Sequence, residues 1–299
     1  MPKPAASWPW PWKALTLPAR AAGFAYVAAR VRRADPRLVH VHYASQGIVG
    51  LMSGRPYVVH CHGSDIRDTV PGGVWERAIS PAILRAAGVL YSTPDLATPA
   101  RRFRRDAVFL PNPVDTQVFR PGSSPERDIL VGIRLDATKG AEIALDAVRR
   151  VVASRPSTTV TVIRSGSIDE GLDRDLGSSV RWIAPVRHRD MPDIIRMHRI
   201  AIGQFASGAI GVYELEAMAC GVPVIADFRY ADSYSDGSPI RPIDHGDRTS
   251  SAVGEMERLL SSEALLRRES AEVRQWAVRH HGSREVVSRL LTYYGTLGK

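Results

Sequence analysis

The chain has 299 residues, of which 44% are hydrophobic and 24% charged, a composition typical of a soluble α/β protein with two domains of ordinary size. Its two cysteines, Cys61 and Cys220, form no CxxC pattern, which argues against a disulfide framework or a cysteine metal site and favours a reducing compartment. The net charge of +9 favours an acidic partner. The arginine-rich stretches at 30–33 and 101–105 are more often solvated helix faces, and no RNA- or DNA-binding motif accompanies them, so we expect no nucleic-acid partner.

The N-terminal segment contains no apolar run that could cross a bilayer, because prolines interrupt it and AAGFAYVAA at 21–29 is too short. We expect neither a signal peptide nor a transmembrane helix, and a cytoplasmic location. An aromatic and basic stretch precedes a helix that should end at 30–33. This stretch suits peripheral binding to an anionic membrane at its inner face, although packing of the tryptophans on the protein's own surface is equally compatible. Its residues are Trp8, Trp10, Trp12, Lys13 and Arg20.

Short runs rich in valine and isoleucine alternate with longer helical patterns along the chain. Strands that alternate with helices predict parallel sheets covered on both faces. The proline-rich stretch at 111–122 falls between the fourth and fifth runs and is the expected domain boundary. The expected strands lie at 38–43, 56–62, 88–92, 107–111, 128–133, 159–163, 180–183, 200–205 and 222–226.

We divide the chain into an N-terminal Rossmann-like domain over 1–114, a C-terminal one over 115–282 and a terminal helix over 283–299, for which a return to the N-terminal domain is one option. Two further helices are expected over 248–280. Two doubly wound domains joined by one linker place a cleft between the carboxyl ends of their strands, and ligands are expected there.

The stretch GAIGVYELEAMACGVPVIA at 208–226 predicts a glycine-opened helix followed by a strand. Ser207 and Gly208 lie where N-cap residues belong, and Gly211 allows a ligand to approach the backbone closely. Gly221 and Pro223 should end the helix. One face should be packed, because apolar residues recur at helical spacing. These residues are Val212, Leu215, Met218 and Ala219.

The start of this helix is a candidate phosphate site, because unpaired N–H groups and the positive end of the helix dipole point outward there. A carboxylate about six residues further along lies roughly 9 Å from the phosphate, where a nucleoside ribose would be. Glu214 and Glu216 are two residues apart and do not share a face, so only one of them can bind the ribose.

Three further segments follow expected strand ends: HCHGSD with His60, His62 and Asp65, GIRLDATKG with Arg134 and Lys139, and WIAPVRH at 182–188. Two cations, a phosphate-accepting helix start and a carboxylate for a ribose make a nucleotide-diphosphate site without a metal ion. We therefore expect no cofactor and no metal.

Together with PNPVD at 111–115, these segments resemble the GT-B glycosyltransferases of the GT4 type (glycosyl transferases group 1), from about residue 38 to the C-terminus. That family transfers a sugar from a nucleotide-sugar donor to an acceptor with retention of anomeric configuration. The resemblance implies two Rossmann-like doubly wound domains that face each other across a cleft. The acceptor hydroxyl would belong to a cell-envelope glycan, a glycolipid or a secondary metabolite.

The resemblance also implies roles for single residues. Arg134 and Lys139 would hold the donor diphosphate and Glu216 the ribose, which leaves Glu214 as the outward or structural glutamate. His62 would lie near the donor sugar and the backbone around Val186 near the base. With His62, Arg134 and Lys139 as catalytic residues, the donor-binding residues are Glu216, Gly208, Ala209, Ile210, Gly211, Val212, Val186 and Asp65.

Two departures from the family pattern stand out. Gly208 occupies the position, eight residues before Glu216, where the family commonly has a first glutamate, so that GAIG replaces EGFG. The N-terminal domain is also shorter than the family norm, with one helix before HVHY. These departures keep open a non-catalytic nucleotide-sugar-binding homologue as the alternative. For an enzyme, the absence of a carboxylate at position 208 favours a front-face route over a double displacement.

Overall fold

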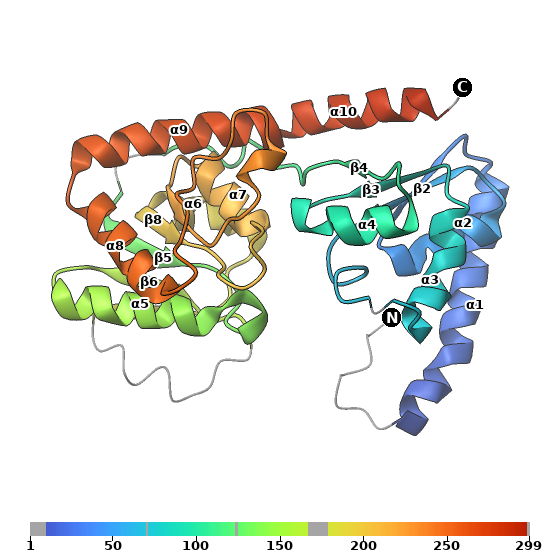
Figure 1. Cartoon of the computed structure of the whole chain (residues 1–299), viewed down its shortest axis with the longest axis horizontal. Helices are drawn as coiled ribbons and strands as arrows, with labels where there is room; N and C mark the ends of the chain where they lie inside the picture. The colour runs from blue at the N-terminus through green and yellow to red at the C-terminus, as the bar shows by residue number, and fades with distance from the viewer. Residues whose placement is uncertain (1–9, 70, 123–124, 167–178, 298–299) are drawn as a thin grey trace. The chain divides into compact units, whose positions relative to one another are not determined.

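The computed structural model describes residues 10–69, 71–122, 125–166 and 179–297 (Figure 1). It separates into two compact units, one that ends at Leu110 and includes the stretch from Gly295, and one that runs from Pro111 to Tyr294. This division falls at the first residue of the proline-rich stretch 111–122. Among the described residues, none of the helices combines the length and the apolar character needed to cross a membrane.

Unit 1 contains a four-stranded parallel sheet in the order β1-β2-β3-β4. In the register of the first pair, His42 lies opposite His60. Gly50 allows α2 to approach β2, because a Cβ atom there would lie 2.5 Å from the ring of Tyr57. The strands are β1 (Val39–His42), β2 (Tyr57–Cys61), β3 (Gly88–Tyr91) and β4 (Val108–Phe109), and the helices are α1 (Trp10–Ala34), α2 (Gly47–Ser53), α3 (Val74–Leu84) and α4 (Ala97–Phe103).

Unit 2 contains a five-stranded parallel sheet in the order β7-β6-β5-β8-β9. Its strands are β5 (Arg127–Val131), β6 (Val160–Ile163), β7 (Val180–Ile183), β8 (His198–Ile202) and β9 (Val224–Ile225). Its helices are α5 (Ala141–Ser154), α6 (Met191–Arg196), α7 (Val212–Ala219), α8 (Arg248–Leu260), α9 (Glu263–His281) and α10 (Ser283–Thr296).

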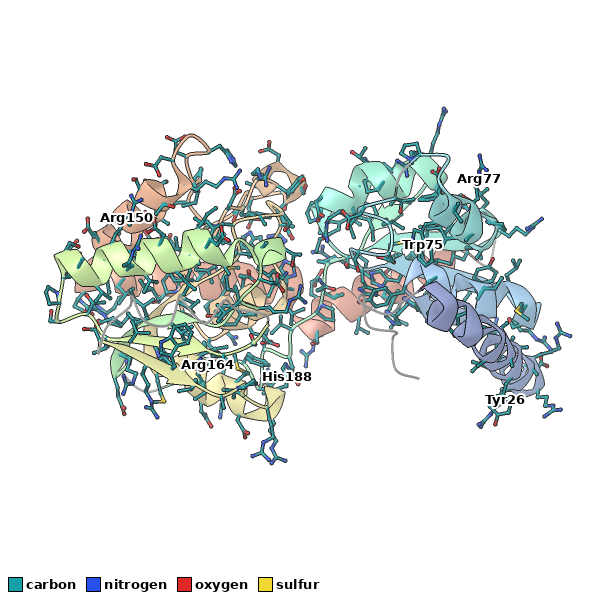
Figure 2. All side chains as sticks on the ribbon, turned by 90° about the horizontal axis from the view of Figure 1, so that it is seen from below. Tyr26, Trp75, Arg77, Arg150, Arg164 and His188 are labelled. Atoms are coloured by element: carbon teal, nitrogen blue, oxygen red, sulfur yellow. The ribbon has the colours of Figure 1, made fainter. Side chains whose placement is uncertain are left out.

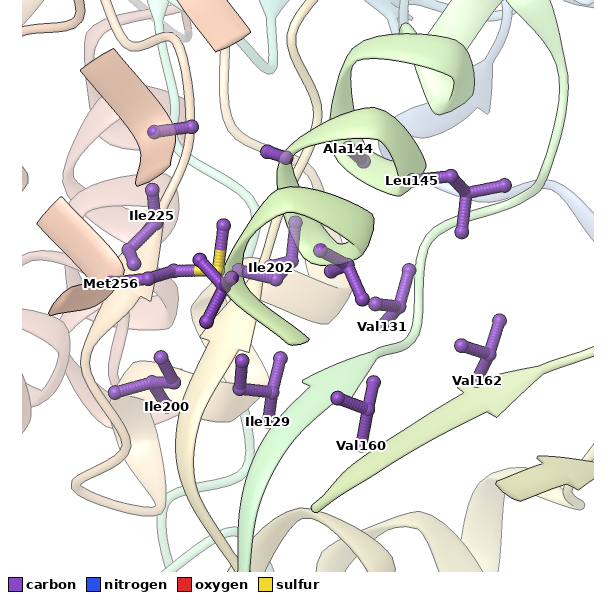
Figure 3. Close-up of a cluster of buried hydrophobic side chains, with 14 of the residues drawn as sticks. Ile129, Val131, Ala144, Leu145, Val160, Val162, Ile200, Ile202, Ile225 and Met256 are labelled. Atoms are coloured by element: carbon purple, nitrogen blue, oxygen red, sulfur yellow. The ribbon is translucent and has the colours of Figure 1, made fainter. Parts of the chain in front are cut away.

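The core of unit 2 lies between one face of this sheet and the helices α5 and α8 (Figure 3). Alternate residues of β5, such as Ile129 and Val131, point to this face because side chains alternate along a strand. Ala144 and Leu145 of α5 and Met256 of α8 cover them. Strands buried on both faces explain the nearly continuous apolar runs of the sequence.

The predicted α/β class with two parallel sheets is confirmed, and each of the predicted apolar runs forms a strand. The predicted helices over 248–280 and at the C-terminus are also present, and α1 ends at Ala34, just after 30–33. Of the predicted membrane-binding tryptophans, Trp8 lies outside the described residues, whereas Trp10 and Trp12 belong to the first turn of α1.

The predicted start of the helix after β8 was wrong. Helix α7 begins at Val212 with Gly211 as its N-cap, instead of Ser207 or Gly208. Gly208 has a φ of +70°, in the left-handed region, which turns the chain and keeps 206–211 as a loop. Val212 is also 46% exposed, so only the later apolar residues of the predicted face are packed.

Candidate functional site

The strand order of unit 2 places its topological switch point between β5 and β8. From β5 the chain proceeds outward through β6 and β7, and it then returns to the other side of β5 as β8 and β9. Ligands of open α/β sheets bind at the carboxyl ends of the two strands that flank such a point. The segments that follow β5 and β8 are residues 132–140 and 203–211, which contain predicted diphosphate-binding residues.

The segment after β5 carries Arg134 and Lys139 on a short turn before α5. Asp136 accepts an ion-paired hydrogen bond from Arg134, and the guanidinium also donates to the hydroxyl of Thr138 at 2.9 Å. The side chain of Arg134 is nevertheless 55% exposed. Gly140, with a φ of +69°, then redirects the chain into α5. An exposed guanidinium in a fixed position suits the recognition of phosphate oxygens.

Gln204 connects the two segments. Lys139 Nζ donates to Gln204 Oε1 at 3.1 Å, and Gln204 Nε2 donates to the carbonyl oxygen of Ala209. Gln204 is buried, so these hydrogen bonds are shielded from water. One amide therefore fixes the ammonium group of Lys139 relative to the loop that precedes α7.

Glu214 stabilises the same loop through hydrogen bonds to its backbone. Its carboxylate accepts the backbone N–H of Gln204 at 2.9 Å and that of Gly211, the N-cap of α7, at 3.0 Å. A Cβ atom at Gly203 would lie 2.7 Å from the Cγ atom of Glu214, so the glycine makes room for this side chain. Of the two roles predicted for Glu214, the outward one was wrong, because the residue is buried and caps the helix.

Glu216 is buried as well, but its carboxylate reaches a different segment. Its Oε1 atom lies 2.6 Å from the Nε2 atom of His188, in the segment after β7. Burial raises the pKa of Glu216, and the hydrogen bond from His188 only partly opposes that rise. The side chain of His188, labelled in Figure 2, is 73% exposed, and its ring lies near that of Phe119, with the centroids 5.4 Å apart. Glu216 thus has a polar partner on the solvent side, which a ligand hydroxyl could replace.

Gly208 is packed against an arginine. A Cβ atom at this position would collide with the Nε atom of Arg229. Arg229 donates to the carbonyl oxygen of Ala206 at 3.1 Å and forms an ion pair with the buried Asp227 at 3.4 Å. The family's usual glutamate is therefore replaced by a glycine whose side-chain position is occupied by a cation.

The remaining predicted residues lie in two places. Val186 is half-buried between β7 and His188, and Ala209 and Ile210 are buried in the loop before α7. His62 and Asp65 belong to unit 1, where Asp65 is buried and serves the loop after β2. Its carboxylate accepts three backbone N–H groups, those of Ala44 at 2.9 Å, His62 at 3.1 Å and Gly63 at 2.8 Å. The donor roles predicted for His62 and Asp65 stay predictions.

Sequence reasoning missed three residues that shape this region. His188 is the last residue of the segment WIAPVRH, which indicated only a backbone contact near Val186. Gln204 lies within an expected strand, and a strand pattern does not reveal a hydrogen bond to a lysine 65 positions earlier. Arg229 carried no signal, because its contact with Gly208 arises only from the tertiary fold.

Two family models match the chain: Glycosyl transferases group 1 over residues 126–261 and Glycosyltransferase Family 4 over residues 3–118. A GDP-mannose-dependent monoacylated alpha-(1-6)-phosphatidylinositol monomannoside mannosyltransferase of Corynebacterium glutamicum is 29% identical over 141 residues, which cover 39% of this chain and 37% of that protein. A D-inositol 3-phosphate glycosyltransferase of Mycobacterium bovis is 27% identical over 130 residues, or 38% of this chain and 27% of that protein. The chain thus matches about a third of the length of these curated relatives.

Solved structures share the fold. Anabaena Alr3699/HepE in complex with UDP-glucose has a TM-score of 0.72 at 17% identity, with 90% of this chain and 82% of that chain covered. Sucrose-phosphate synthase of Thermosynechococcus elongatus has a TM-score of 0.73 at 17% identity, with 99% and 81% covered. The two matched regions together take in most of the sequence: the C-terminal part matches the glycosyl transferases group 1, the N-terminal part matches the glycosyltransferase family 4, and the fold is that of the GT-B glycosyltransferases.

Proposed function

We propose that this chain is a retaining glycosyltransferase that moves a sugar from a nucleotide-diphosphate sugar to an acceptor hydroxyl. The observation that carries the proposal is the hydrogen-bonded connection at the switch point of unit 2, where Gln204 joins Lys139 to the loop that opens α7. It brings a cation and the start of a helix together, and both favour a phosphate group. The buried carboxylate of Glu216 in the same helix would bind the ribose hydroxyls in place of His188.

The reaction would gain most from stabilisation of the departing diphosphate. Arg134, Lys139 and the N-terminus of α7 would offset the negative charge that grows as the glycosidic bond breaks. The diphosphate itself would take the proton of the acceptor hydroxyl. Because Gly208 offers no carboxylate for a covalent intermediate, the acceptor would enter from the face that the diphosphate leaves. The positive charges of Arg134 and Lys139 would make a metal ion unnecessary for holding the diphosphate.

The donor and acceptor can be sought among the chemistries of the relatives. One relative uses GDP-mannose and a structural neighbour binds UDP-glucose, so a panel of GDP- and UDP-sugars covers both bases. Inositol-containing acceptors suit the panel, since two relatives act on a phosphatidylinositol mannoside and on inositol 3-phosphate. Cell extract serves as the general acceptor source. The reaction is run in EDTA, and its product is identified by mass spectrometry. Nucleotide release and a retained anomeric configuration would support the proposal.

A non-catalytic nucleotide-sugar binder is the second candidate, because Arg229 occupies the place of the family's usual glutamate beside Gly208. The two candidates differ in one measurement. A binder gains thermal stability with a nucleotide sugar but releases no nucleotide, whereas a transferase shows at least slow hydrolysis of its donor.

The basic and aromatic N-terminus further leads us to propose reversible binding to an anionic membrane surface, where lipid-linked acceptors are found.

A further inference from the structure

Four histidines gather on one face of the sheet in unit 1. His40 and His42 lie on β1 and His60 on β2, and His62 follows β2 directly. Because side chains alternate along a strand and His42 is paired with His60, all four imidazoles project to the same face. Neighbouring ring centroids lie 4.6 Å apart for His40 and His42, 4.3 Å for His60 and His62, and 5.0 Å for His42 and His62.

The ring nitrogens face one another at distances suited to a shared ion. His40 Nε2 lies 3.3 Å from His60 Nδ1, and one nitrogen from each of His40, His42 and His60 lies within 4.8 Å of the other two. Two nitrogens bound to a tetrahedral zinc ion, each at about 2.0–2.1 Å, are about 3.3 Å apart. The first pair already has this separation, and His42 supplies the third nitrogen within 4.8 Å of the other two.

One ring of the cluster is buried and only partly hydrogen-bonded. Among the described residues, His60 has no hydrogen-bond partner of acceptable geometry for its Nε2 atom, whereas its Nδ1 atom, which faces His40, is the nitrogen that an ion would bind. Burial, with a smaller contribution from the neighbouring histidines, lowers the pKa of His60 to about 2 and that of His40 to about 4, while the backbone near Leu110 only partly opposes the shift for His60. Burial thus favours the neutral imidazoles of His40 and His60, and the geometry of their ring nitrogens is what suits an ion.

We propose that His40, His42 and His60 bind one divalent transition-metal ion, with zinc as the ion to be tested because histidine nitrogens are among its usual protein ligands. This site lies within unit 1. His62 is a positioning residue, because its Nε2 atom lies 2.7 Å from His42 Nδ1 and fixes the orientation and tautomer of that ring. Three protein ligands leave one position of a tetrahedral ion open for water or another small ligand.

The test uses the full-length protein without a histidine tag, stripped with EDTA and then dialysed. Titration with zinc chloride by calorimetry should show one site per chain, and cobalt chloride should give the visible absorption of a tetrahedral Co²⁺ ion. His42→Gln is the principal variant, because this exposed side chain can change without loss of the core, and it should weaken zinc binding by about 100-fold. His62→Gln should weaken zinc binding by about 10- to 100-fold, the range seen for groups that orient a ligating histidine.

His245→Gln, at a half-exposed histidine of unit 2, is the matched control and should leave the titration unchanged. Circular dichroism confirms that each variant is folded. The proposal is overturned if the native protein binds neither zinc nor cobalt. It is also overturned if binding is weak, occurs at several sites per chain and is the same in His42→Gln as in the native protein.

Discussion

The Nε2 atom of His188 lies 2.6 Å from the Oε1 atom of Glu216, which joins the segment after β7 to helix α7. One partner is exposed and the other is buried. Glu214, two residues earlier on the same helix, has its carboxylate directed at the backbone of Gln204 and Gly211 instead. Two positions along a helix amount to about 200° of rotation, so the glutamates serve different sides of the helix. Substitution of Glu216 should therefore affect nucleotide binding, and substitution of Glu214 should affect stability.

Glu216→Gln should weaken the binding of UDP and GDP by about 10- to 100-fold. Hydrogen bonds from ribose hydroxyls to a charged group contribute about 1.5–3 kcal/mol, and Gln keeps the shape of the side chain but not its charge. Isothermal calorimetry measures the affinities. Glu272→Gln, at an exposed glutamate of α9, is the control and should bind as the native protein does. Native affinity in Glu216→Gln would mean that α7 only packs and that the nucleotide binds elsewhere.

Glu214→Ala should reduce stability more than affinity. The change leaves the N–H groups of Gln204 and Gly211 without their acceptor, and a buried unsatisfied group costs about 1–3 kcal/mol. We expect a loss of about 2–4 kcal/mol in the free energy of unfolding, measured by urea titration. Unchanged stability combined with a loss of nucleotide binding in Glu214→Ala would mean that Glu214, and not Glu216, binds the ribose.

Arg134→Ala should lower turnover more than donor affinity. The guanidinium is exposed and already paired with Asp136, so in the ground state it gains little from the donor. Its contribution should grow as charge develops on the departing diphosphate, and only interactions that strengthen in the transition state raise the rate. Steady-state kinetics with the donor found in the panel separates kcat from KM. Arg149→Ala, at an exposed arginine of α5, is the control. An increase in KM with native kcat would assign Arg134 to ground-state binding alone.

Gly208→Ala should damage the nucleotide site, whereas Gly237→Ala should not. Both glycines have a φ of +70°, so both alanine variants bear the cost of a left-handed residue, about 1–2 kcal/mol. A Cβ atom at Gly237 meets no atom of the described residues within 4 Å, but one at Gly208 collides with Arg229. The difference between the variants in unfolding free energy and in nucleotide affinity isolates the displacement of Arg229. Equal effects would show that Arg229 moves away without consequence.

Acid should destabilise the protein through its buried histidines. Burial lowers the pKa of His281 from 6.5 to about 4. At a pH between these two pKa values, His281 is protonated in the unfolded state but not in the folded state. Stability is therefore lost as the pH falls below about 6.5. His281 alone should account for roughly 2 kcal/mol between pH 7.5 and pH 5. Urea titrations at both pH values should show a smaller pH difference in His281→Gln than in the native protein. An unchanged difference in His281→Gln would contradict the assignment.

Replacement of Trp8, Trp10 and Trp12 by Ala should reduce co-sedimentation with anionic vesicles. The aromatic rings favour the membrane interface, and each nearby lysine or arginine adds about 1 kcal/mol of attraction to anionic lipid. Trp75→Phe, at an exposed tryptophan of α3, controls for tryptophan loss elsewhere. Binding that is equal in the native protein and the triple variant would rule out this surface.

The sequence alone determined the features that depend on neighbours along the chain. Apolar periodicity located the strands and the helices, because it reflects which side chains lie on one face of an element. Gly221 ended helix α7 as predicted, with a φ of +75°, because only a residue without Cβ adopts that backbone readily. The order of the motifs likewise indicated the family before any geometry was available.

The tertiary structure decided which of these elements meet. The order β7-β6-β5-β8-β9 brings His188 to Glu216 across 28 residues and Gln204 to Lys139 across 65, and no local pattern encodes either pair. The pairing of β1 with β2 likewise turns two short histidine motifs, HVH and HCH, into one cluster. Periodicity specifies a face but not its partner, because strand order and register depend on burial summed over the whole sheet.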